Sequence, residues 1–469
     1  MDKIEDTYFL DAMSALAVAK EANRFGAYNH LQICYYSGEK IESEYENHIH
    51  LPEEKIVERL LKLNTRVPTK FLGVDEEFCL KQFKILLEKK AELSSKYIKI
   101  IQAEKLNFQE KLRVYIGADY GGKVVLKIYE QLNRSFLKAS CEVLYDVNDA
   151  LTLMDEYSRV KNIAAFKPHI TVNINRVRNE FLGEESFNFV WFQDPTLVLY
   201  DESRIRKRER DYFYYLVENF KEALLVKGIE KKKIAKQNFG TNRDAFYEEH
   251  GVKRENKVVF IGNNYLEIVS PTLNYKNETL LLNEISIMFN QKQLSTEKMK
   301  ELSLEYVKKG LIKSEEHLEM FLFPAIVRIE ILKWMCKQDT IAVEIYGGGW
   351  SDIEEFKPYC KGYLKDETAI RHICNSAKYS LLAHPEYYYQ QRLMEASACG
   401  SIPLVYKGAN NFEEFYHKDN VLLFDDEASL LHQIGKIPLQ PQQQIADDMS
   451  YENFIKKMIK TVKENQINE

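Results

Sequence analysis

The chain has 469 residues, 45% of them hydrophobic and 12% aromatic, which is enough for two or three domains with large cores. Its net charge of -6 excludes the basic character typical of nucleic-acid-binding proteins, and no apolar run is long enough to cross a membrane. The seven cysteines are scattered, and the acidic N-terminus is unlike a secretion signal. We therefore expect a soluble, cytoplasmic protein that binds no nucleic acid and makes at most peripheral contact with membranes.

The first part of the chain, residues 1–105, is rich in helical patterns. Segments such as "PEEKIVERLLKLNTR" place apolar residues at steps of three and four. One segment, "LQICYYS", is a candidate strand. The sequence therefore predicts a helical N-terminal module.

From Leu112 onward, short apolar runs alternate with helical patterns. The predicted strands of a first series include "LRVYIGADYGG", "CEVLYDV", "HITVNIN" and "NFVWFQDP"; those of a second include "KVVFIGNNY", "IAVEIYGGGW", "KYSLLAHP" and "SIPLVYKG". Such alternation favours parallel sheets covered on both faces. We predict an α/β fold with two Rossmann-like domains, residues 106–255 and 256–440, and a C-terminal helix at 441–469 that packs back on the first.

The stretch "HPEYYYQQRLMEASACGSIPLVY", which begins at His384, carries the most specific pattern in the chain. Gly400 is expected to end a helix, since glycine adopts the left-handed conformation without a steric cost. Arg392 and Glu395 lie on one face of that helix. A cation there could hold a phosphate and a carboxylate could bind a ribose diol, whereas a surface ion pair is the simpler alternative.

This stretch resembles the donor-binding segment of GT-B glycosyltransferases of the "group 1" type. The segments "VVFIGNNY", "VEIYGGGW", "CNSAKYSLLAHPE" and "FYHKDNVLLFDD" resemble other parts of that family in the same order, so the resemblance covers residues 112 to about 430. It implies two Rossmann-like domains facing a cleft, with the α-helical N-terminal extension added. It also implies transfer of a sugar from a nucleotide-diphosphate sugar to a protein, saccharide or lipid acceptor.

The resemblance further implies a set of donor-binding residues. They are Glu395 for the ribose, Arg392 for the diphosphate, Gly262 and Asn263 for the phosphate loop, and Gly347 and Tyr363 for the base. Many relatives have two glutamates with seven residues between them, but here eight residues separate Glu386 from Glu395 and Tyr387 takes the expected position. The stereochemical outcome is therefore left open.

Two residues are candidates for catalysis. Asp194 ends a predicted strand of the first domain and is the leading candidate for the base, although an aspartate before proline is more often a turn former. His384 follows a predicted strand beside the donor sugar, where it either takes part in catalysis or caps the turn. The chain contains no D-x-D motif, so we predict transfer without a metal or other cofactor, with Arg392 and helix amides balancing the leaving diphosphate.

Three other patterns allow two interpretations each. "GADYGGKV" has the spacing of a P-loop but ends in Val124 instead of a hydroxyl residue, so we interpret it as an acceptor-side glycine turn that comprises Gly117, Asp119, Tyr120 and Gly121. "RIRKRER", residues 204–210, is typical of a solvated face, with contact to an anionic lipid or acidic acceptor as the alternative. Tyr387–Tyr389 either stack on sugars or pack the helix start against the core.

Two other functions stay open from the sequence: a catalytically silent scaffold that binds nucleotide-sugars, and a nucleotide-sugar epimerase on the same fold. A dinucleotide oxidoreductase is disfavoured because the strand-to-helix turns lack G-x-G-x-x-G. The helical module is placed to recruit a protein acceptor or a partner. The donor base, the sugar and the identity of the acceptor are not fixed by the sequence.

Overall fold

The computed structural model describes residues 7–25, 32–36, 40–42, 48–63, 70–118, 123–147, 156–194, 196, 199, 205–266, 275–294, 296–312, 315, 318, 322–385, 388–408 and 415–466. The chain divides into two compact units, one of Met1–Gln237 with Met458–Glu469 and the other of Asn238–Lys457. The residues just after Asn238 belong to the second unit because Phe246 packs against its core and Arg254 donates to the carbonyl oxygen of Cys399 at 2.9 Å.

The N-terminal module is not purely helical. Its helices are α1 (Ala12–Phe25), α2 (Ile56–Leu63) and α3 (Glu76–Ala103), and its strands are β1 (Thr7–Leu10), β2 (Gln32–Tyr35), β3 (His48–His50) and β4 (Lys70–Leu72). The strands form a parallel sheet in the order β3-β2-β1-β4. The candidate strand "LQICYYS" is confirmed as β2. The other three strands were not predicted, because strands of three or four residues are too short to show an alternating pattern.

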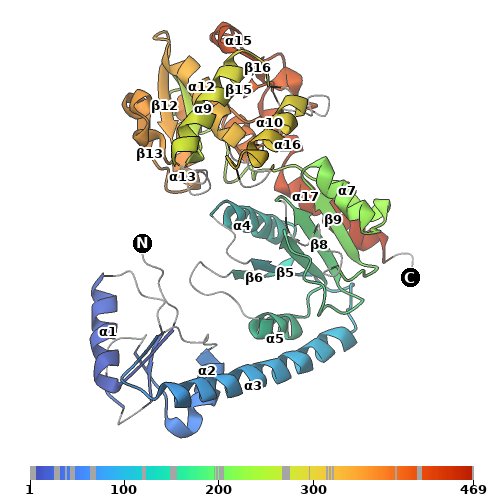
Figure 1. Cartoon of the computed structure of the whole chain (residues 1–469). Helices are drawn as coiled ribbons and strands as arrows, with labels where there is room; N and C mark the ends of the chain where they lie inside the picture. The colour runs from blue at the N-terminus through green and yellow to red at the C-terminus, as the bar shows by residue number, and fades with distance from the viewer. Residues whose placement is uncertain are drawn as a thin grey trace. The chain divides into compact units, whose positions relative to one another are not determined.

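The first α/β domain has a six-stranded parallel sheet in the order β10-β9-β8-β7-β5-β6 (Figure 1). Its elements are β5 (Arg113–Ala118), α4 (Lys123–Lys138), β6 (Glu142–Val147), α5 (Glu156–Phe166), β7 (Ile170–Ile174), β8 (Phe187–Phe192), β9 (Asp211–Tyr215), α7 (Glu218–Val226) and β10 (Ile234–Lys236). Strands β7 and β8 are buried along their whole length, as expected for a parallel sheet covered on both faces.

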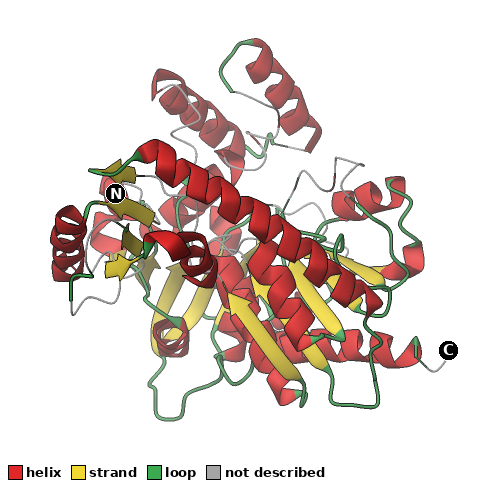
Figure 2. Ribbon diagram, turned by 90° about the horizontal axis from the view of Figure 1, so that it is seen from below, coloured by secondary structure: helices red, strands yellow, loops and turns green. Residues whose placement is uncertain are grey.

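The second unit has its own six-stranded parallel sheet, in the order β13-β12-β11-β14-β15-β16. Its strands are β11 (Glu255–Ile261), β12 (Ala342–Tyr346), β13 (Cys360–Gly362), β14 (Ala377–Leu382), β15 (Ile402–Tyr406) and β16 (Leu422–Phe424). Its helices are α9 (Tyr275–Asn290), α10 (Thr296–Lys308), α12 (Phe323–Cys336), α13 (Glu367–Ser376), α14 (Gln391–Ala398), α15 (Glu427–Gln433), α16 (Gln443–Asp448) and α17 (Tyr451–Glu464), the last of which continues into the first unit. Helices and strands alternate through both α/β regions, which confirms the predicted fold class of two Rossmann-like domains (Figure 2).

Helix α12 forms the centre of the second unit's core. Its sequence "FPAIVRIEILKWMC" is apolar almost all round, which is typical of a helix buried on every side. Pro324 lies in the first turn, where its missing N–H leaves no hydrogen bond unmade. The helix packs in one cluster with residues of β11, β12 and β14. Two charged side chains, Arg328 and Glu330, are buried with it.

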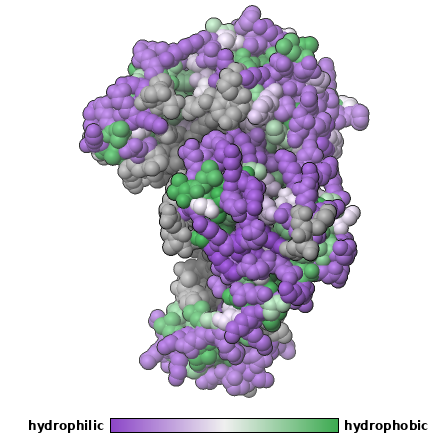
Figure 3. All heavy atoms as spheres, turned by 90° about the vertical axis from the view of Figure 1, so that its right-hand side faces the viewer, coloured by the Kyte–Doolittle hydropathy of each residue, from purple (hydrophilic) through white to green (hydrophobic). Residues whose placement is uncertain are grey.

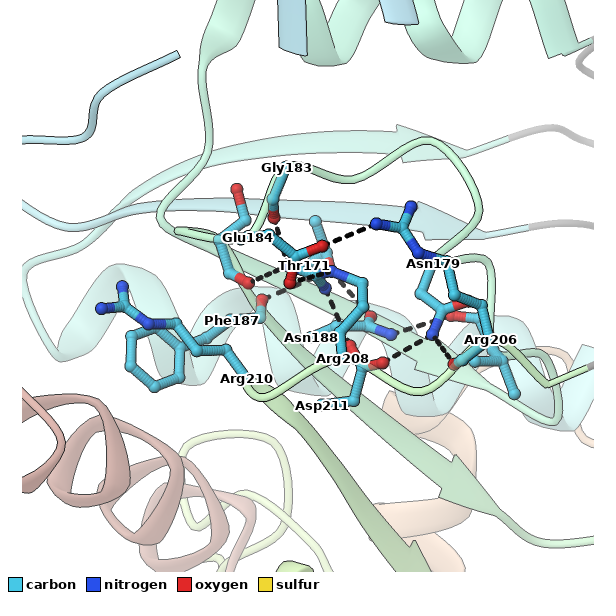
Figure 4. A network of polar contacts seen from close by, with 12 residues as sticks. Thr171, Asn179, Gly183, Glu184, Phe187, Asn188, Arg206, Arg208, Arg210 and Asp211 are labelled. Atoms are coloured by element: carbon cyan, nitrogen blue, oxygen red, sulfur yellow. Dashed lines mark hydrogen bonds and ion pairs between the residues drawn. The ribbon is translucent and has the colours of Figure 1, made fainter. Parts of the chain in front are cut away.

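The basic run at residues 204–210 is only partly solvated: Arg206 and Lys207 are exposed, whereas Arg208 and Arg210 are buried. Arg208 is buried and pairs with buried Asp211 at 2.8 Å, and it donates to the carbonyl oxygens of Gly183 and Ser186 (Figure 4). Arg210 lies over the ring of Phe187, 4.9 Å from its centroid. The run leads directly into β9, so these arginines line the sheet and satisfy backbone groups.

Only Arg206 of these described arginines keeps substantial exposure; it pairs with Glu184 at 2.6 Å. Arg204 lies outside the described residues. The face of the molecule in Figure 3 is mostly hydrophilic, with small hydrophobic patches. Among the described helices, none has both the length and the apolar character needed to cross a membrane.

Candidate functional site

The order of strands in the second sheet defines a switch point between β11 and β14. The chain adds β12 and β13 on one side of β11, then returns to add β14, β15 and β16 on the other. In open parallel sheets, ligands bind outside the carboxyl ends of the strands at such a point. The residues that follow these strands are Gly262 after β11, Gly347 after β12 and His384 after β14. All three were predicted as site residues from the sequence.

Hydrogen bonds to backbone groups join the turns that follow β11 and β12. The N–H of Gly262 donates to the carbonyl oxygen of Tyr346 at 2.8 Å, and the Gly348 N–H donates to Oδ1 of Asn263 at 3.0 Å. Trp350 Nε1 donates to the carbonyl oxygen of Gly262 at 2.7 Å. Gly347 has a φ of +135°, and a Cβ there would lie 2.2 Å from that same oxygen, so only glycine fits.

Tyr363 borders the same turn from the neighbouring strand. It follows β13 and is 69% exposed, while the preceding residue, Gly362, accepts a hydrogen bond from the Gly347 N–H at 3.0 Å. A Cβ on Gly348 would come within 2.0 Å of the Tyr363 hydroxyl, so the ring lies directly against this turn. The structure therefore brings Gly347 and Tyr363 together, with an exposed aromatic ring next to a bare backbone.

Arg328 of α12 is a residue of this site that sequence reasoning missed. Its Nη1 donates to the carbonyl oxygen of Asn263 at 2.6 Å, and its Nη2 donates to the Tyr265 hydroxyl at 2.9 Å. The guanidinium lies 3.9 Å from the centroid of the Tyr265 ring. Two groups on the turn after β11 thus orient one buried cation at the switch point. The available signal was an arginine within a mostly apolar helix, since arginine is rarely buried without a specific partner.

His384 lies buried at the end of β14. Burial lowers its pKa to about 3, and the positive charge of nearby Arg328 adds to this effect. The imidazole is therefore neutral near pH 7. In this state it can donate or accept a hydrogen bond, but it is a weak proton acceptor, which favours a positioning contact over general base catalysis.

Glu395 and Arg392 form the ion pair that their spacing allowed, yet it is not a surface pair. The Glu395 side chain is only 2% exposed, whereas that of Arg392 is 34% exposed. Arg392 contacts one carboxylate oxygen of Glu395, and Nε2 of Gln391 donates to the other at 2.9 Å. Helix α14 thus holds a buried carboxylate in a fixed orientation. Gly400, with φ +76°, ends this helix as predicted.

The two described tyrosines before α14 pack into the core and lie outside the helix. The helix begins at Gln391, after Tyr388 and Tyr389, which are buried in a core cluster with Phe415. The Tyr389 hydroxyl hydrogen-bonds to Nδ1 of His417 at 2.9 Å, and Nε2 of His417 hydrogen-bonds to Asp448 at 3.0 Å. This favours packing over sugar stacking for the two described tyrosines.

The first α/β domain places Asp194 just beyond the carboxyl end of β8. Nδ2 of Asn175 donates to its carboxylate at 2.7 Å, and the Asp194 N–H donates back to Oδ1 of Asn175 at 3.1 Å. Desolvation by the surrounding protein raises the pKa of Asp194 above its usual value, although the hydrogen bond from Asn175 acts to lower it. The residue keeps solvent access. A raised pKa suits a carboxylate that must accept a proton nearer to neutral pH.

Gly117, an acceptor-side candidate, is buried near the end of β5, where its carbonyl oxygen accepts from Arg178 at 2.8 Å. The other acceptor-side candidates, Asp119, Tyr120 and Gly121, lie outside the described residues. So do Glu386 and Tyr387.

Comparison with known proteins bears on the second unit. Residues 328–456 match the model of a family described as glycosyl transferase-like. The match begins at Arg328 and includes His384, Arg392 and Glu395. It confirms the resemblance to glycosyltransferases for this part of the chain and supports the predicted class of enzyme. No curated protein matches the chain.

Several solved structures are similar to the chain. One is a sucrose-phosphate synthase from Thermosynechococcus elongatus, with 9% identity, coverage of 77% of this chain and 100% of that chain, and a TM-score of 0.46. Another is HepE of Anabaena in complex with UDP-glucose, with 9% identity, 75% and 100% coverage, and a TM-score of 0.43. A third is a glycosyltransferase from Rickettsia africae, with 10% identity, 77% and 100% coverage, and a TM-score of 0.44.

Proposed function

We propose that the protein is a glycosyltransferase that moves a sugar from a nucleotide-diphosphate sugar to an acceptor, without a metal. The observation that carries this proposal is the position of Arg328 beside the glycine turn at Gly262, with His384 near Arg328, within the unit that contains the glycosyl transferase-like match. A bare backbone beside a buried cation suits the close approach of a diphosphate.

The donor roles follow from what each group offers. Arg328 is the cation for the diphosphate, and the Gly262–Asn263 turn provides backbone that the phosphates can approach. Glu395 presents a carboxylate that Gln391 orients, which suits a ribose diol with two hydroxyl donors. The exposed ring of Tyr363 beside Gly347 offers a flat surface for the base. His384, neutral and buried, positions the donor sugar by hydrogen bonding.

For Arg392 we propose a role in supporting Glu395, beside the diphosphate contact that the resemblance implies. Its contact with Glu395 orients the carboxylate. We therefore assign the diphosphate to Arg328 and the support of Glu395 to Arg392. Arg392 keeps a third of its side-chain surface exposed, so it can also reach a bound phosphate from the rim.

Metal-independent transfer is supported by the cation that the site itself supplies. A guanidinium held by Asn263 and Tyr265 can stabilise the charge that develops on a leaving diphosphate, which is the task a divalent ion performs in other enzymes.

The acceptor is assigned to the first α/β domain, with Asp194 as the base. Asn175 orients its carboxylate, and its raised pKa brings proton acceptance closer to neutral pH. In this assignment Asp194 removes a proton from the acceptor hydroxyl as that oxygen attacks the anomeric carbon. The bond from that carbon to the diphosphate breaks, and Arg328 stabilises the leaving group.

The first test is a thermal-shift titration of the whole chain against UDP, GDP, dTDP and CMP, each free and as its common sugars, with and without EDTA. One nucleotide family should stabilise the protein, by about 2.7 kcal/mol when the ligand is at 100 times its Kd, and EDTA should not change the shift. Glu395→Gln should reduce the shift. Glu330→Gln, an equally buried carboxylate of α12 that pairs with Asn290 and Lys333, is the matched control.

Two results would contradict the proposal. A shift that EDTA abolishes would exclude metal-independent binding, and equal shifts for Glu395→Gln and the wild type would remove Glu395 from the donor site. Nucleotide binding without any transfer, together with an Asp194→Asn variant that behaves as the wild type, would identify a silent nucleotide-sugar-binding scaffold.

A further inference from the structure

Helix α14, which carries Glu395, depends on its surroundings for its position. It has only eight residues, and its N-cap residue, Gln390, makes no side-chain capping hydrogen bond. A helix of two turns gains little from its own hydrogen bonds, so packing must hold it in place. Helix α16 supplies part of that packing, because its Ile445 lies in one buried cluster with Leu393 of α14.

Two consecutive carboxylates, Asp447 and Asp448, end α16. Carboxylates are unfavourable in the last turn of a helix, where the backbone carbonyl groups carry partial negative charge, and this last turn has no basic residue. Partners outside α16 therefore explain the two aspartates better than the helix itself does. Each aspartate has such a partner, and each partner leads to one end of α14.

Asp448 leads to the start of α14 through two buried side chains. Its carboxylate lies 3.0 Å from Nε2 of His417, and Nδ1 of His417 lies 2.9 Å from the Tyr389 hydroxyl oxygen. An ionised carboxylate only accepts, so the neutral imidazole donates from Nε2 and accepts the tyrosine proton at Nδ1. Tyr389 lies two residues before Gln391, which begins α14 and whose amide orients the Glu395 carboxylate.

Asp447 leads to the other end of α14 through Arg243. Its carboxylate lies 3.3 Å from Nε of Arg243, and Nη1 of the same guanidinium donates to the carbonyl oxygen of Ala398 at 3.3 Å. Ala398 is the last residue of α14, so a cation lies where the helix leaves carbonyl oxygens without intrahelical partners. The two neighbouring carboxylates of α16 thus reach both ends of the helix that carries Glu395.

The end of α16 is itself tied to another segment of the chain. The carbonyl oxygen of Met449, the next residue, accepts from the N–H of Thr241 at 3.3 Å, and the Tyr451 N–H donates to the carbonyl oxygen of Thr241 at 3.2 Å. A Cβ on Gly240 would lie 2.5 Å from the Met449 oxygen, so only glycine allows this close approach. The two aspartates therefore extend from a fixed point of the second unit.

We propose that Asp447 and Asp448 are positioning residues that fix α14, and with it the carboxylate of Glu395. They act through Arg243 and His417, respectively. The link to a donor rests on the proposed function, in which Glu395 binds the ribose, whereas the support of α14 rests on the contacts of the second unit alone. The His417 side chain is 8% exposed and that of Arg243 is 35% exposed, so the His417 branch carries more of the effect.

Hydrogen exchange of the whole chain, followed by mass spectrometry without any ligand, tests the support of α14. In Asp448→Ala, the amides of α14 should exchange roughly threefold to tenfold faster, as expected for the loss of one or two hydrogen bonds. Strands β14 and β15 of the same unit should exchange as in the wild type. Asp448→Asn should restore most of the protection, because its amide oxygen can still accept from His417.

Asp426→Ala is the matched control. It removes the capping box of α15 and an ion pair to Lys292, so it should lower the stability of the second unit without changing the exchange of α14. Asp447→Ala should speed the exchange of α14 less than Asp448→Ala does, because the Arg243 branch is more exposed.

The link to the donor is tested by calorimetry with whichever of UDP, GDP, dTDP and CMP binds the wild type most tightly. The Kd of that nucleotide should rise roughly threefold to tenfold in Asp448→Ala, because the Glu395 carboxylate is then less well oriented. Asp448→Asn and Asp426→Ala should keep the wild-type Kd.

Unchanged exchange of α14 in Asp448→Ala would overturn the proposal. So would faster exchange throughout the second unit, or a similar change of α14 in Asp426→Ala, because both indicate general destabilisation. Faster exchange of α14 with an unchanged Kd would overturn it as well, since Glu395 would then not depend on this support. If the wild type binds none of the four nucleotides, the proposed function fails instead, and the exchange of α14 alone decides whether Asp448 supports the helix.

Discussion

Both α/β sheets are parallel and six-stranded, but their switch points differ in the groups that line them. In the second sheet, hydrogen bonds to backbone groups join the turns at Gly262 and Gly347, and the guanidinium of Arg328 lies beside them. In the first sheet, side chains dominate: Arg178 donates to the carbonyl oxygen of Gly117 at the end of β5, and Asp194 follows β8.

The difference indicates a division of tasks. A backbone-lined turn accommodates a group common to many ligands, such as a diphosphate, because N–H groups and bare glycine carry little side-chain specificity. A cluster of long charged side chains selects by the charge and shape of a particular ligand. The four experiments below test this division, in order of decreasing expected effect.

Asp194→Asn tests the reacting group of the first sheet. If Asp194 is the base, transfer should slow by roughly 100- to 10,000-fold, while the affinity for the nucleotide donor stays unchanged. The amide keeps the size of the side chain and can still contact Asn175. Measured kcat and donor Kd give the answer, and a variant with wild-type kcat would exclude Asp194 as the base.

Gly347→Ala tests the backbone-lined turn of the second sheet. The new Cβ would lie 2.2 Å from the Gly262 carbonyl oxygen at a φ of +135°, so we expect a loss of about 3 kcal/mol or more in the free energy of unfolding. Gly251→Ala is the control, since Gly251 has φ +83° but no atom within 4 Å of the added Cβ. Gly251→Ala should lower the free energy of unfolding by only about 1 to 2 kcal/mol. If urea unfolding shows similar decreases for both variants, the close contact between the Gly262 and Gly347 turns does not matter for stability.

Arg328→Gln tests the cation beside the glycine turn of the second sheet. Loss of a charged hydrogen bond to the diphosphate should weaken donor binding by roughly 10- to 100-fold. Arg371→Gln is the control, because Arg371 is also partly buried and hydrogen-bonded, to Glu249 and the Ala245 carbonyl oxygen, on helix α13. Comparable donor Kd values for both variants, measured by calorimetry, would place the diphosphate elsewhere.

The pH dependence of stability tests the burial of His384. Its pKa is lowered to about 3 in the folded protein, whereas an unfolded histidine titrates near its usual value of about 6.5. Between these values the unfolded chain binds more protons, so the second unit should lose stability as the pH falls below about 6.5. Urea unfolding at pH 7, 6 and 5 should show a shallower loss for His384→Gln than for the wild type. His250→Gln, at an exposed histidine, should keep the wild-type slope; equal slopes for all three would contradict the assigned burial.

Local patterns in the sequence determined most of the two sheets. Buried parallel strands are continuous apolar runs, so segments such as "HITVNIN" and "KVVFIGNNY" could be placed directly. Gly400 could be identified as a helix stop because the left-handed conformation at φ +76° is a local requirement. Glu395 could be proposed through its resemblance to a family, although its burial could not.

Tertiary structure alone decided which distant residues meet. Arg328 reaches Asn263 across 65 positions of chain, and no periodicity in either segment encodes that contact. Arg208 of the basic run became an interior residue because folding pairs it with Asp211 at the start of β9 and with carbonyl oxygens of a distant turn. The short strands β1–β4 form only because they pair with one another. A sequence records each residue's local preference, whereas the partner of a buried charge is fixed by packing between segments that the chain brings together only when it folds.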